Sequence, residues 1–563
     1  MLNRRQILLI LLLLSIFLAI GCNVQNISKV PSQEKNPVKS SIQSSTEEQS
    51  PKNKTIPQNP AETEIAVKPE TEPECLSPEQ INKDFCQENK CDVAIIVDSN
   101  IYADLIPEIN QYKADLKKEF NYNVIVKDYL PSSDIKEIKS YVKSLYINGD
   151  LKGVLLIGDV PTATFFHPSV LQDSVFLSAG APQGDFYYLD IYDKCPYSSQ
   201  RDAYDYSPYE CNPPKFIAPF WISRIIPPKK LKSEWASLIK NYFYRNHNYR
   251  TGQYKYDQKL LFYPPSLNDE SKEYQKDTLD FIFKQLNERG IYRNDQIKLV
   301  DYTIPSGEEY LRELSKPYEF VLINAHGSSI YHQYGIISEK IINPGPMIYE
   351  IRSCSVGRFT DEDYLVGHYL FKGNSFFTIA ATVPVSASST PNFDRLLMLT
   401  NGETIFNTYR YFTVGVNWLG DPTLRMRYLE RDYKEDSPKI CLDKKEIDFG
   451  NVKIDRKSNI FGAGTIKIIN KGKTKLKVFS DIWLKEGYYQ ADGTYIEELS
   501  PRQEKTLLLS VTQISVLADG KEVIPDVAQR SGKFLGEFYI MSNDPKYPVI
   551  TIPFKGEVTE IIG

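Results

Sequence analysis

Histidine, methionine and tryptophan are scarce in this chain, with 5, 5 and 4 residues among 563. Because only five imidazoles are available, few positions can carry acid–base or metal chemistry. The sequence also lacks an HExxH motif, a CxxC pair and a phosphate-binding glycine loop. These absences argue against a zinc protease, a dithiol redox site and a nucleotide-binding P-loop. We therefore predict no metal site and no cofactor.

Charge of one sign is not in excess, and no basic block is present. Lys and Arg total 67, Asp and Glu total 72, and the net charge is −5. Nucleic acid is not an expected partner, since it requires a clustered positive surface. Long apolar runs are missing too, because Ile7–Ile20, broken by Ser15, is too short to span a bilayer comfortably.

That apolar run follows Arg4 and Arg5, as the hydrophobic region of a signal peptide does; a retained signal anchor is the alternative. The next residues, "LAIGC", end at Cys22 and resemble a bacterial lipobox. The resemblance implies that residues 1–22 are a lipoprotein signal peptide with its lipid-bearing cysteine, and that residues 1–21 are removed. We expect a cell-envelope lipoprotein, anchored in a membrane through lipid on Cys22 and exposed outside the cytoplasm.

Residues 23–74 contain no aromatic residue, no glycine and no cysteine. They are rich in Pro, Ser, Lys, Glu, Gln and Asn, so they cannot bury enough apolar surface to offset the entropy of ordering. We predict a disordered tether that reaches roughly 40 Å.

Residues 75–254 and 255–430 are expected to form two α/β subdomains. Short apolar segments, such as 93–98, 153–159 and 297–301, alternate with amphipathic helical segments. Continuous apolar strands separated by helices indicate a parallel sheet that is covered on both faces. The predicted fold class of this region is α/β.

Residues 438–560 change to short strands with alternating apolar and polar residues, which predicts an all-β sandwich. The segments "IDFGNV", "INKG", "SNDP" and "IPFKGEV" resemble Hydin-type (ASH) immunoglobulin-like domains. The resemblance implies the immunoglobulin-like fold and a surface for a protein partner, but no chemistry.

The segment "FVLINAHGSS" places one of the rare histidines, His326, directly after a buried-looking strand. The next apolar segment, "MIYEIRSC", ends at Cys354. Functional groups collect beyond the carboxyl ends of parallel strands, so two neighbouring strands would bring thiol and imidazole to one edge. A thiol beside an imidazole is the minimum for nucleophilic cysteine chemistry. The N–H groups of Gly327 and Cys354 are candidates for an oxyanion hole.

Several motifs occur in the order seen in gingipain-type peptidases, which are caspase-like (clan CD) cysteine peptidases. They are "VLLIGDVPTATF", "GDFYYLD", "ISRI", "NAHGSS", "IRSCSVGRF", "SFFTIAATVP" and "WLGDPTLRMR", and they cover about 92–430. The resemblance implies a caspase-like fold, His326 as catalytic histidine, Cys354 as nucleophile, and a protein or peptide substrate. Ala325 departs from the family, which often has glycine before the histidine.

The acid that orients the histidine comes from the first half of such enzymes, and Asp185 in "GDFYY" is the candidate. Its alternative role is that of a turn-capping residue. The acidic loop 185–205 suits Ca²⁺ by charge but lacks a calcium-loop pattern, so we interpret it as a solvated loop. Glu350 and Arg352 interrupt an apolar strand, which suggests a sheet edge or a position facing substrate. Asp421, in "LGDPT", is predicted to be structural, and His332, His368, His167 and His247 to be surface or packing residues.

The eight cysteines suit an exported protein that forms disulfides. We predict a Cys195–Cys211 bridge within one Tyr- and Pro-rich insertion, worth on the order of 3 kcal/mol. A second bridge among Cys75, Cys86 and Cys91 is plausible with partners undecided, and Cys441 is expected to be a buried free thiol.

Two functions fit these observations. The first is a cysteine endopeptidase that uses the Cys354–His326 dyad. The second is a catalytically inactive caspase-like lipoprotein that serves as a surface-binding or scaffold module.

Overall fold

The computed structural model describes Leu76 and most of residues 91–562. The gaps within that range are 150, 167–182, 192, 194, 199–202, 206–215, 218–219, 265–271, 301–306, 383–392, 401, 410, 413–414, 427–435, 456–461, 481–494, 512–514, 519–520, 526–531 and 548. The predicted signal peptide, Cys22 and the predicted tether lie outside the described residues. Within the described part, no helix combines the length and the apolar character that crossing a membrane requires.

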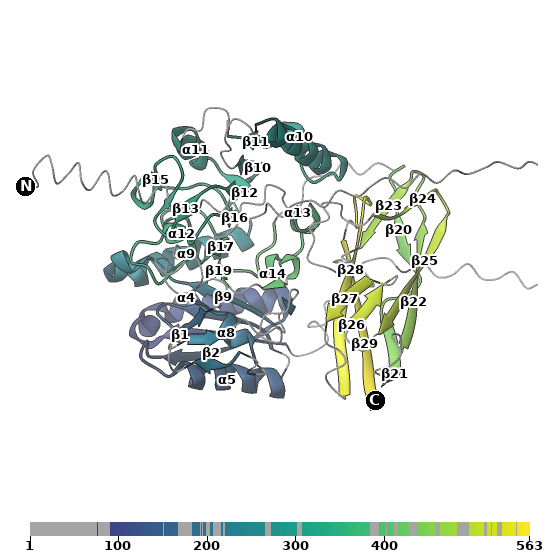
Figure 1. Cartoon of the computed structure of the whole chain (residues 1–563), viewed down its shortest axis with the longest axis horizontal. Coiled ribbons are helices and arrows are strands. Elements are labelled where there is room, and N and C mark those ends of the chain that lie inside the picture. Colours follow the sequence, from purple (N-terminus) through teal and green to yellow (C-terminus); the bar gives the residue numbers. More distant parts are fainter. Residues whose placement is uncertain are drawn as a thin grey trace, which may run out of the picture. The chain divides into compact units, whose positions relative to one another are not determined.

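A ten-stranded sheet organises the first region (Figure 1). Its strands, in spatial order, are β11 (Ile297–Leu299), β10 (Asp257–Tyr263), β12 (Tyr318–Asn324), β16 (Ile348–Arg352), β17 (Phe377–Ala381), β19 (Val416–Gly420), β9 (Trp221–Ile225), β3 (Leu151–Ile157), β1 (Asp92–Asp98) and β2 (Asn123–Tyr129). Neighbours from β11 to β17 pair in parallel, as do those from β9 to β2, while β17 and β19 are antiparallel. The predicted α/β class with a mainly parallel sheet is confirmed.

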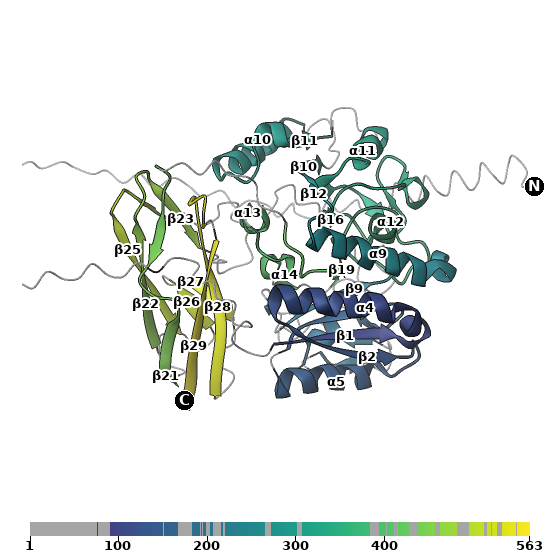
Figure 2. The ribbon, with the colours of Figure 1, turned by 180° about the vertical axis from the view of Figure 1, so that it is seen from behind.

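Helices cover this sheet, because its strands are apolar on both sides. They are α4 (Ser99–Phe120), α5 (Ile135–Asn148), α8 (Phe186–Leu189), α9 (Trp235–Arg250), α10 (Lys272–Glu288), α11 (Gly307–Leu314), α12 (Leu365–Phe371), α13 (Phe393–Thr400) and α14 (Ile405–Thr408), with 3-10 turns η1 (Lys229–Glu234), η3 (Asn294–Gln296) and η4 (Ser338–Lys340). Helix α9 contacts both α4 and α12 along one face of the sheet (Figure 2). Helix α4 begins at Ser99 because the Asp98 side chain accepts from the N–H of Asn100.

The two α/β halves share this sheet, since β19 and β9 pair at Leu419 and Arg224. The end of β9 also meets the segment that follows β16: the hydroxyl of Tyr364 donates to the carbonyl of Ile226, and the N–H of Lys230 donates to the carbonyl of Glu362 at 2.8 Å. One edge of the sheet therefore collects loops from both halves.

The loops contain shorter strands, which form small separate sheets. They are β13 (Gly327–Ser328), β14 (Tyr331–His332) and β15 (Ile336–Ile337) in one small sheet, β18 (Tyr411–Phe412) with β8 (Phe216–Ile217), and β5 (Gln183–Gly184), β4 (Ala163–Phe166), β7 (Ala203–Asp205) and β6 (Tyr197–Ser198) in another. The first of these sheets lies between β12 and β16 in the sequence and so adjoins the predicted dyad.

Two five-stranded sheets form the predicted all-β region. One contains β20 (Ile440–Leu442), β22 (Gly462–Asn470), β25 (Glu504–Val511), β26 (Ser515–Ala518) and β27 (Lys521–Pro525); the other contains β21 (Ile447–Asp455), β29 (Val549–Ile562), β28 (Gly532–Ser542), β23 (Leu476–Ser480) and β24 (Tyr495–Leu499). Residues of both sheets, such as Ile468 and Ile552, share one buried cluster, as expected for a sandwich. The sheets are antiparallel except that β21 pairs with β29 in parallel.

Disulfides involve Cys91, Cys195 and Cys441. The prediction that Cys441 is a free thiol is therefore wrong. It lies in β20, where Leu442 pairs with Leu76, so a preceding segment of the chain reaches this strand. Cys195 is bonded as predicted, while its predicted partner Cys211 lies outside the described residues, as do Cys75 and Cys86.

Candidate active site

The register of β12 and β16 aligns His326 with Cys354. Phe320 pairs with Ile348 and Asn324 with Arg352, a constant offset of 28 residues. One residue further, the N–H of Ala325 still donates to the carbonyl of Arg352 at 3.3 Å. Parallel strands lie about 4.8 Å apart. Because the same offset links 326 to 354, histidine and cysteine emerge at matched positions, two residues beyond adjacent strands.

The two loops that follow these strands also pack against each other. A Cβ atom added to Gly327 would lie 2.3 Å from the Oγ atom of Ser353 and 3.4 Å from a methyl of Val356. Only glycine fits so close an approach. The residue after His326 thus lies close to Ser353, which precedes Cys354, and to Val356, which follows it by two residues, so the two loops lie together.

The two predicted catalytic side chains differ in exposure. His326 is exposed, whereas Cys354 is only 7% exposed and forms no disulfide. The next residue, Ser355, has φ = 59°, a left-handed conformation that non-glycine residues rarely adopt. Such backbone strain, on the order of 1–3 kcal/mol, is concentrated at functional sites. The thiol therefore sits at a sharp turn whose shape the surrounding packing must maintain.

A second histidine, His332, links the hairpin that follows His326 to the loop that carries Cys354. It is 0% exposed, and its Nδ1 atom lies 3.1 Å from the Oγ atom of Ser353. Burial lowers its pKa to about 3, so the ring is neutral in the folded protein. The packing role predicted for His332 is confirmed, but its link to Ser353 was missed. The only signal was its place six residues after His326, in the return strand of a short hairpin.

The hairpin also determines what the Gly327 N–H can bind. Gly327 faces His332, and the N–H of Gln333 donates to the carbonyl of His326 at 2.8 Å. This pattern makes Gly327 and His332 a non-hydrogen-bonded pair of the antiparallel ladder. Hence the N–H of Gly327 makes no ladder hydrogen bond within the described hairpin. The predicted oxyanion hole requires this, because the N–H must be available to the substrate oxygen.

Asp185 takes part in a buried ion pair. Its Oδ2 atom accepts from Nε of Arg224 at 2.9 Å and its Oδ1 atom from Nη2 at 2.6 Å. Arg224 is fully buried, and the pKa of its guanidinium is raised. Burial alone would lower this pKa, but the attraction of the Asp185 carboxylate outweighs the effect of burial. Asp185 precedes α8 without a side-chain capping bond. These contacts support neither the turn-capping role nor an orienting role toward His326, because the carboxylate is engaged by Arg224.

This ion pair nevertheless lies near the thiol loop. The Arg224 guanidinium stacks 4.5 Å from the ring centre of Phe359, five residues after Cys354. It also donates to the carbonyl of Val160 at 2.7 Å. The Asp185–Arg224 pair therefore joins the end of β3 and the "GDFYY" segment to the loop that carries Cys354.

Glu350 and Arg352 belong to a central strand, so the predicted edge position is wrong. Glu350 is buried and accepts from Arg352 at 2.8 Å and from the hydroxyl of Tyr409 at 2.8 Å. Burial raises the pKa of Glu350, but Arg352 and Arg395 more than offset this, and the pKa is lowered overall. Because Glu350 and Arg352 neutralise each other, the strand that carries them can lie in the interior of the sheet.

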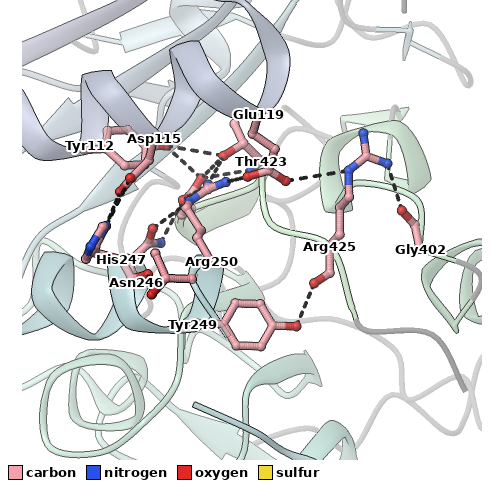
Figure 3. Close-up of polar contacts among 12 residues, drawn as sticks. Tyr112, Asp115, Glu119, Asn246, His247, Tyr249, Arg250, Gly402, Thr423 and Arg425 are labelled. Carbon is pink, nitrogen blue, oxygen red and sulfur yellow. Dashed lines mark hydrogen bonds and ion pairs between the residues drawn. The ribbon is translucent and has the colours of Figure 1, made fainter. Parts of the chain in front are cut away.

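Asp421 follows β19, which is antiparallel to β17, and its partners Tyr112, Asn246 and Arg250 are drawn in Figure 3. Its carboxylate accepts from Tyr112 of α4 at 2.9 Å, from Asn246 of α9 at 2.8 Å and from Arg250 at 2.7 Å. Burial raises its pKa, but Arg250 and Thr423 reverse the effect and hold the pKa below its usual value. The structural role predicted for Asp421 is thus confirmed, and it connects two helices to the end of β19.

Two other histidines bind carboxylates. His247 binds Asp115 at 2.9 Å, and His368 binds Asp363 at 2.7 Å, while His167 lies outside the described residues. In the described part of the chain, no three His, Cys, Asp or Glu side chains are grouped so as to hold a metal ion. The acidic loop 185–205 is described only in part.

No protein-family model matches the sequence, and no curated protein matches it. Solved structures with a similar fold include the Arg-specific cysteine proteinase gingipain R, with 14% identity, a TM-score of 0.42, and coverage of 84% of this chain and 98% of that one. The RgpB pro- and mature-domain complex of Porphyromonas gingivalis has 13% identity, a TM-score of 0.41, and coverage of 83% and 100%. The ASH domain of human CEP192 covers 25% of this chain and 99% of its own length, with 14% identity and a TM-score of 0.15. Similarity at this level identifies no residue of the site and no activity of this chain.

Proposed function

We propose that this chain is a cysteine endopeptidase of the cell envelope, with Cys354 as nucleophile and His326 as acid and base. One observation carries the proposal: the register of β12 and β16 brings a rare histidine and a cysteine to matched positions beyond adjacent parallel strands. The order of the surrounding motifs, from "NAHGSS" to "IRSCSVGRF", supports it.

In this mechanism the Cys354 thiolate attacks the carbonyl carbon of a peptide bond, and the N–H groups of Gly327 and Cys354 stabilise the resulting oxyanion. The tetrahedral intermediate collapses to a thioester as His326 protonates the departing amine. Water then attacks the thioester, His326 accepts its proton, and the thiol is restored. The exposed position of His326 lets its ring approach both substrate and thiol, and the orientation needed in the complex does not have to exist in the free protein.

Anchoring through lipid on Cys22 completes the proposal. The lipobox-like "LAIGC" supports it, and the disulfides of Cys91, Cys195 and Cys441 suit an oxidising compartment. The rival function, a caspase-like binding module without turnover, is favoured by the low exposure of the Cys354 side chain.

Cleavage of a mixed peptide library by the full-length protein in detergent separates these functions. We expect Cys354→Ala and His326→Ala each to abolish cleavage while circular dichroism shows an unchanged fold. His247→Ala, which removes an imidazole paired with Asp115 on α4, is the matched control and should retain cleavage. An active-site-directed thiol probe should label the wild type at Cys354. Cleavage by folded Cys354→Ala would show that the mechanism is wrong, and a folded wild type that neither cleaves nor reacts would favour the binding module.

A further inference from the structure

A guanidinium four residues beyond the proposed nucleophile has unused hydrogen-bonding capacity. Arg358 is half-buried, and its side chain makes a long hydrogen bond from Nη2 to the carbonyl of Thr382 at 3.4 Å. Its Nε atom is buried without a hydrogen-bond partner, and among the described residues no carboxylate forms an ion pair with it. A desolvated donor on a charged group is costly to leave unmet.

A second donor without a hydrogen-bond partner belongs to Thr382, the residue whose carbonyl Arg358 contacts. Thr382 follows β17, is 0% exposed, and its hydroxyl also lacks a hydrogen-bond partner. Because Nη2 of Arg358 reaches the backbone of this residue, the guanidinium and the threonine belong to one corner of the sheet edge. Both donors therefore suit an oxygen-rich group that comes from outside the chain.

The backbone holds Arg358 in place on both sides. The N–H of Gly357 donates to the carbonyl of Ala381 at 2.8 Å, and a Cβ atom at Gly357 would lie 2.7 Å from the carbonyl of Ala380. Phe359 stacks on the buried Arg224. A side chain presented from such a fixed segment is preorganised, which reduces the entropy that binding would cost.

Two other arginines near the sheet edge are paired with carboxylates. Arg352 is paired with Glu350, and Arg224 with Asp185. Arg358 differs from both in keeping the Nε side of its fork unpaired, and this side matches the two oxygens of a carboxylate. It lies between the end of β16, which leads to Cys354, and the end of β17.

We propose that Arg358 and Thr382 form a specificity site for an acidic side chain of the substrate, adjacent to the peptide bond that Cys354 attacks. The inference rests on the proposed peptidase function and deepens it, since it assigns acidic peptides as the substrate class. The carboxylate would accept from Nε and one Nη of Arg358 and from the Thr382 hydroxyl, so the site would bind Glu or Asp and reject Lys or Arg.

The test uses the full-length protein and peptides that differ only by Glu or Gln at each of the three positions on either side of the cleaved bond. The wild type should prefer Glu at one position by about ten- to hundredfold in kcat/KM, the range expected for a charge-assisted hydrogen bond. Arg358→Gln should remove that preference and leave the Gln peptide within about twofold. Arg358→Lys should keep part of it, and Arg358→Glu should shift the preference to Lys.

Arg293→Gln is the control, since Arg293 is exposed and pairs with Asp295 away from this edge. Binding of the same peptides to Cys354→Ala, with and without Arg358→Gln, gives a measurement that needs no turnover. Binding that depends on Glu and on Arg358 supports the site even if the wild type cleaves nothing, in which case only the peptidase proposal fails. Equal binding of Glu and Gln peptides, or an unchanged preference in folded Arg358→Gln, would overturn the inference.

Discussion

The buried His332 should make the stability of the α/β region depend on pH. Its ring is neutral in the folded protein because burial lowers its pKa to about 3. An unfolded chain exposes the same imidazole, whose ordinary pKa is about 6.5. Below pH 6.5 the unfolded state therefore binds a proton that the folded state refuses, so stability falls as pH falls from about 6.5 toward 3.

The size of the effect follows from the two pKa values. Between pH 7 and pH 5, His332 should cost the folded state about 2 kcal/mol, and the full difference of about 3.5 pKa units corresponds to about 5 kcal/mol. His332→Asn is the informative variant, because its amide can still contact Ser353 but cannot titrate. It should be less stable than the wild type at pH 7, by roughly 1–3 kcal/mol for the lost packing, and should lose about 2 kcal/mol less on acidification.

Urea denaturation at pH 7, 6 and 5 measures this difference. Tryptophan fluorescence is a suitable probe, since Trp221, Trp235 and Trp418 are buried in the α/β region. Cys354→Ala is the matched control: it alters the same loop but leaves His332 in place, so its pH dependence should parallel that of the wild type. Equal slopes for the wild type and His332→Asn would refute the argument that burial keeps this imidazole neutral.

Three further outcomes are expected. Asp185→Asn should destabilise the protein by about 3–5 kcal/mol in the same denaturation assay, because Arg224 would remain buried without a counter-charge; a change below about 1 kcal/mol would contradict this. Gly327→Ala should reduce peptide cleavage more than it reduces stability, since the added methyl would collide with Ser353 and displace the His326 loop; retained cleavage would show that the two loops are not tightly coupled. Cys22→Ser should move the protein from the detergent phase to the aqueous phase in a partitioning assay; identical partitioning of both forms would refute lipid anchoring.

The strand ends were predictable because they depend on local pattern. Apolar segments bounded by turns gave β1, β3 and β12, and the Asp residues before α4 and α5 both cap them as side-chain acceptors. Adjacent parallel strands end at the same edge of a sheet, so the residues that follow them are neighbours whatever the rest of the fold is. The prediction that His326 and Cys354 follow neighbouring strands thus required only that β12 and β16 be adjacent, which the structure shows.

Partners distant in the sequence were not predictable in the same way. Asp185 and Arg224 are 39 residues apart, and neither "GDFYY" nor "ISRI" indicates that the two side chains form an ion pair in the interior. Glu350 and Arg352 appeared misplaced in a strand because their neutralising contacts, which include Tyr409, depend on tertiary packing. Cys441 appeared to be a core thiol for the same reason.

The same distinction explains why Arg358 emerged only from the structure. In the sequence it is one of many cations, and its neighbours "GRFTDED" include enough carboxylates to suggest an ordinary surface pair. In the structure, Asp363 binds His368 and Lys230 instead, and among the described residues neither Asp361 nor Glu362 forms an ion pair with Arg358. Arg358 lies four residues after Cys354, and its guanidinium contacts the residue that follows β17. A cation held rigidly beside a proposed nucleophile, with buried donors unmet, selects for an anionic substrate group by the same electrostatics that would make Lys or Arg unfavourable there.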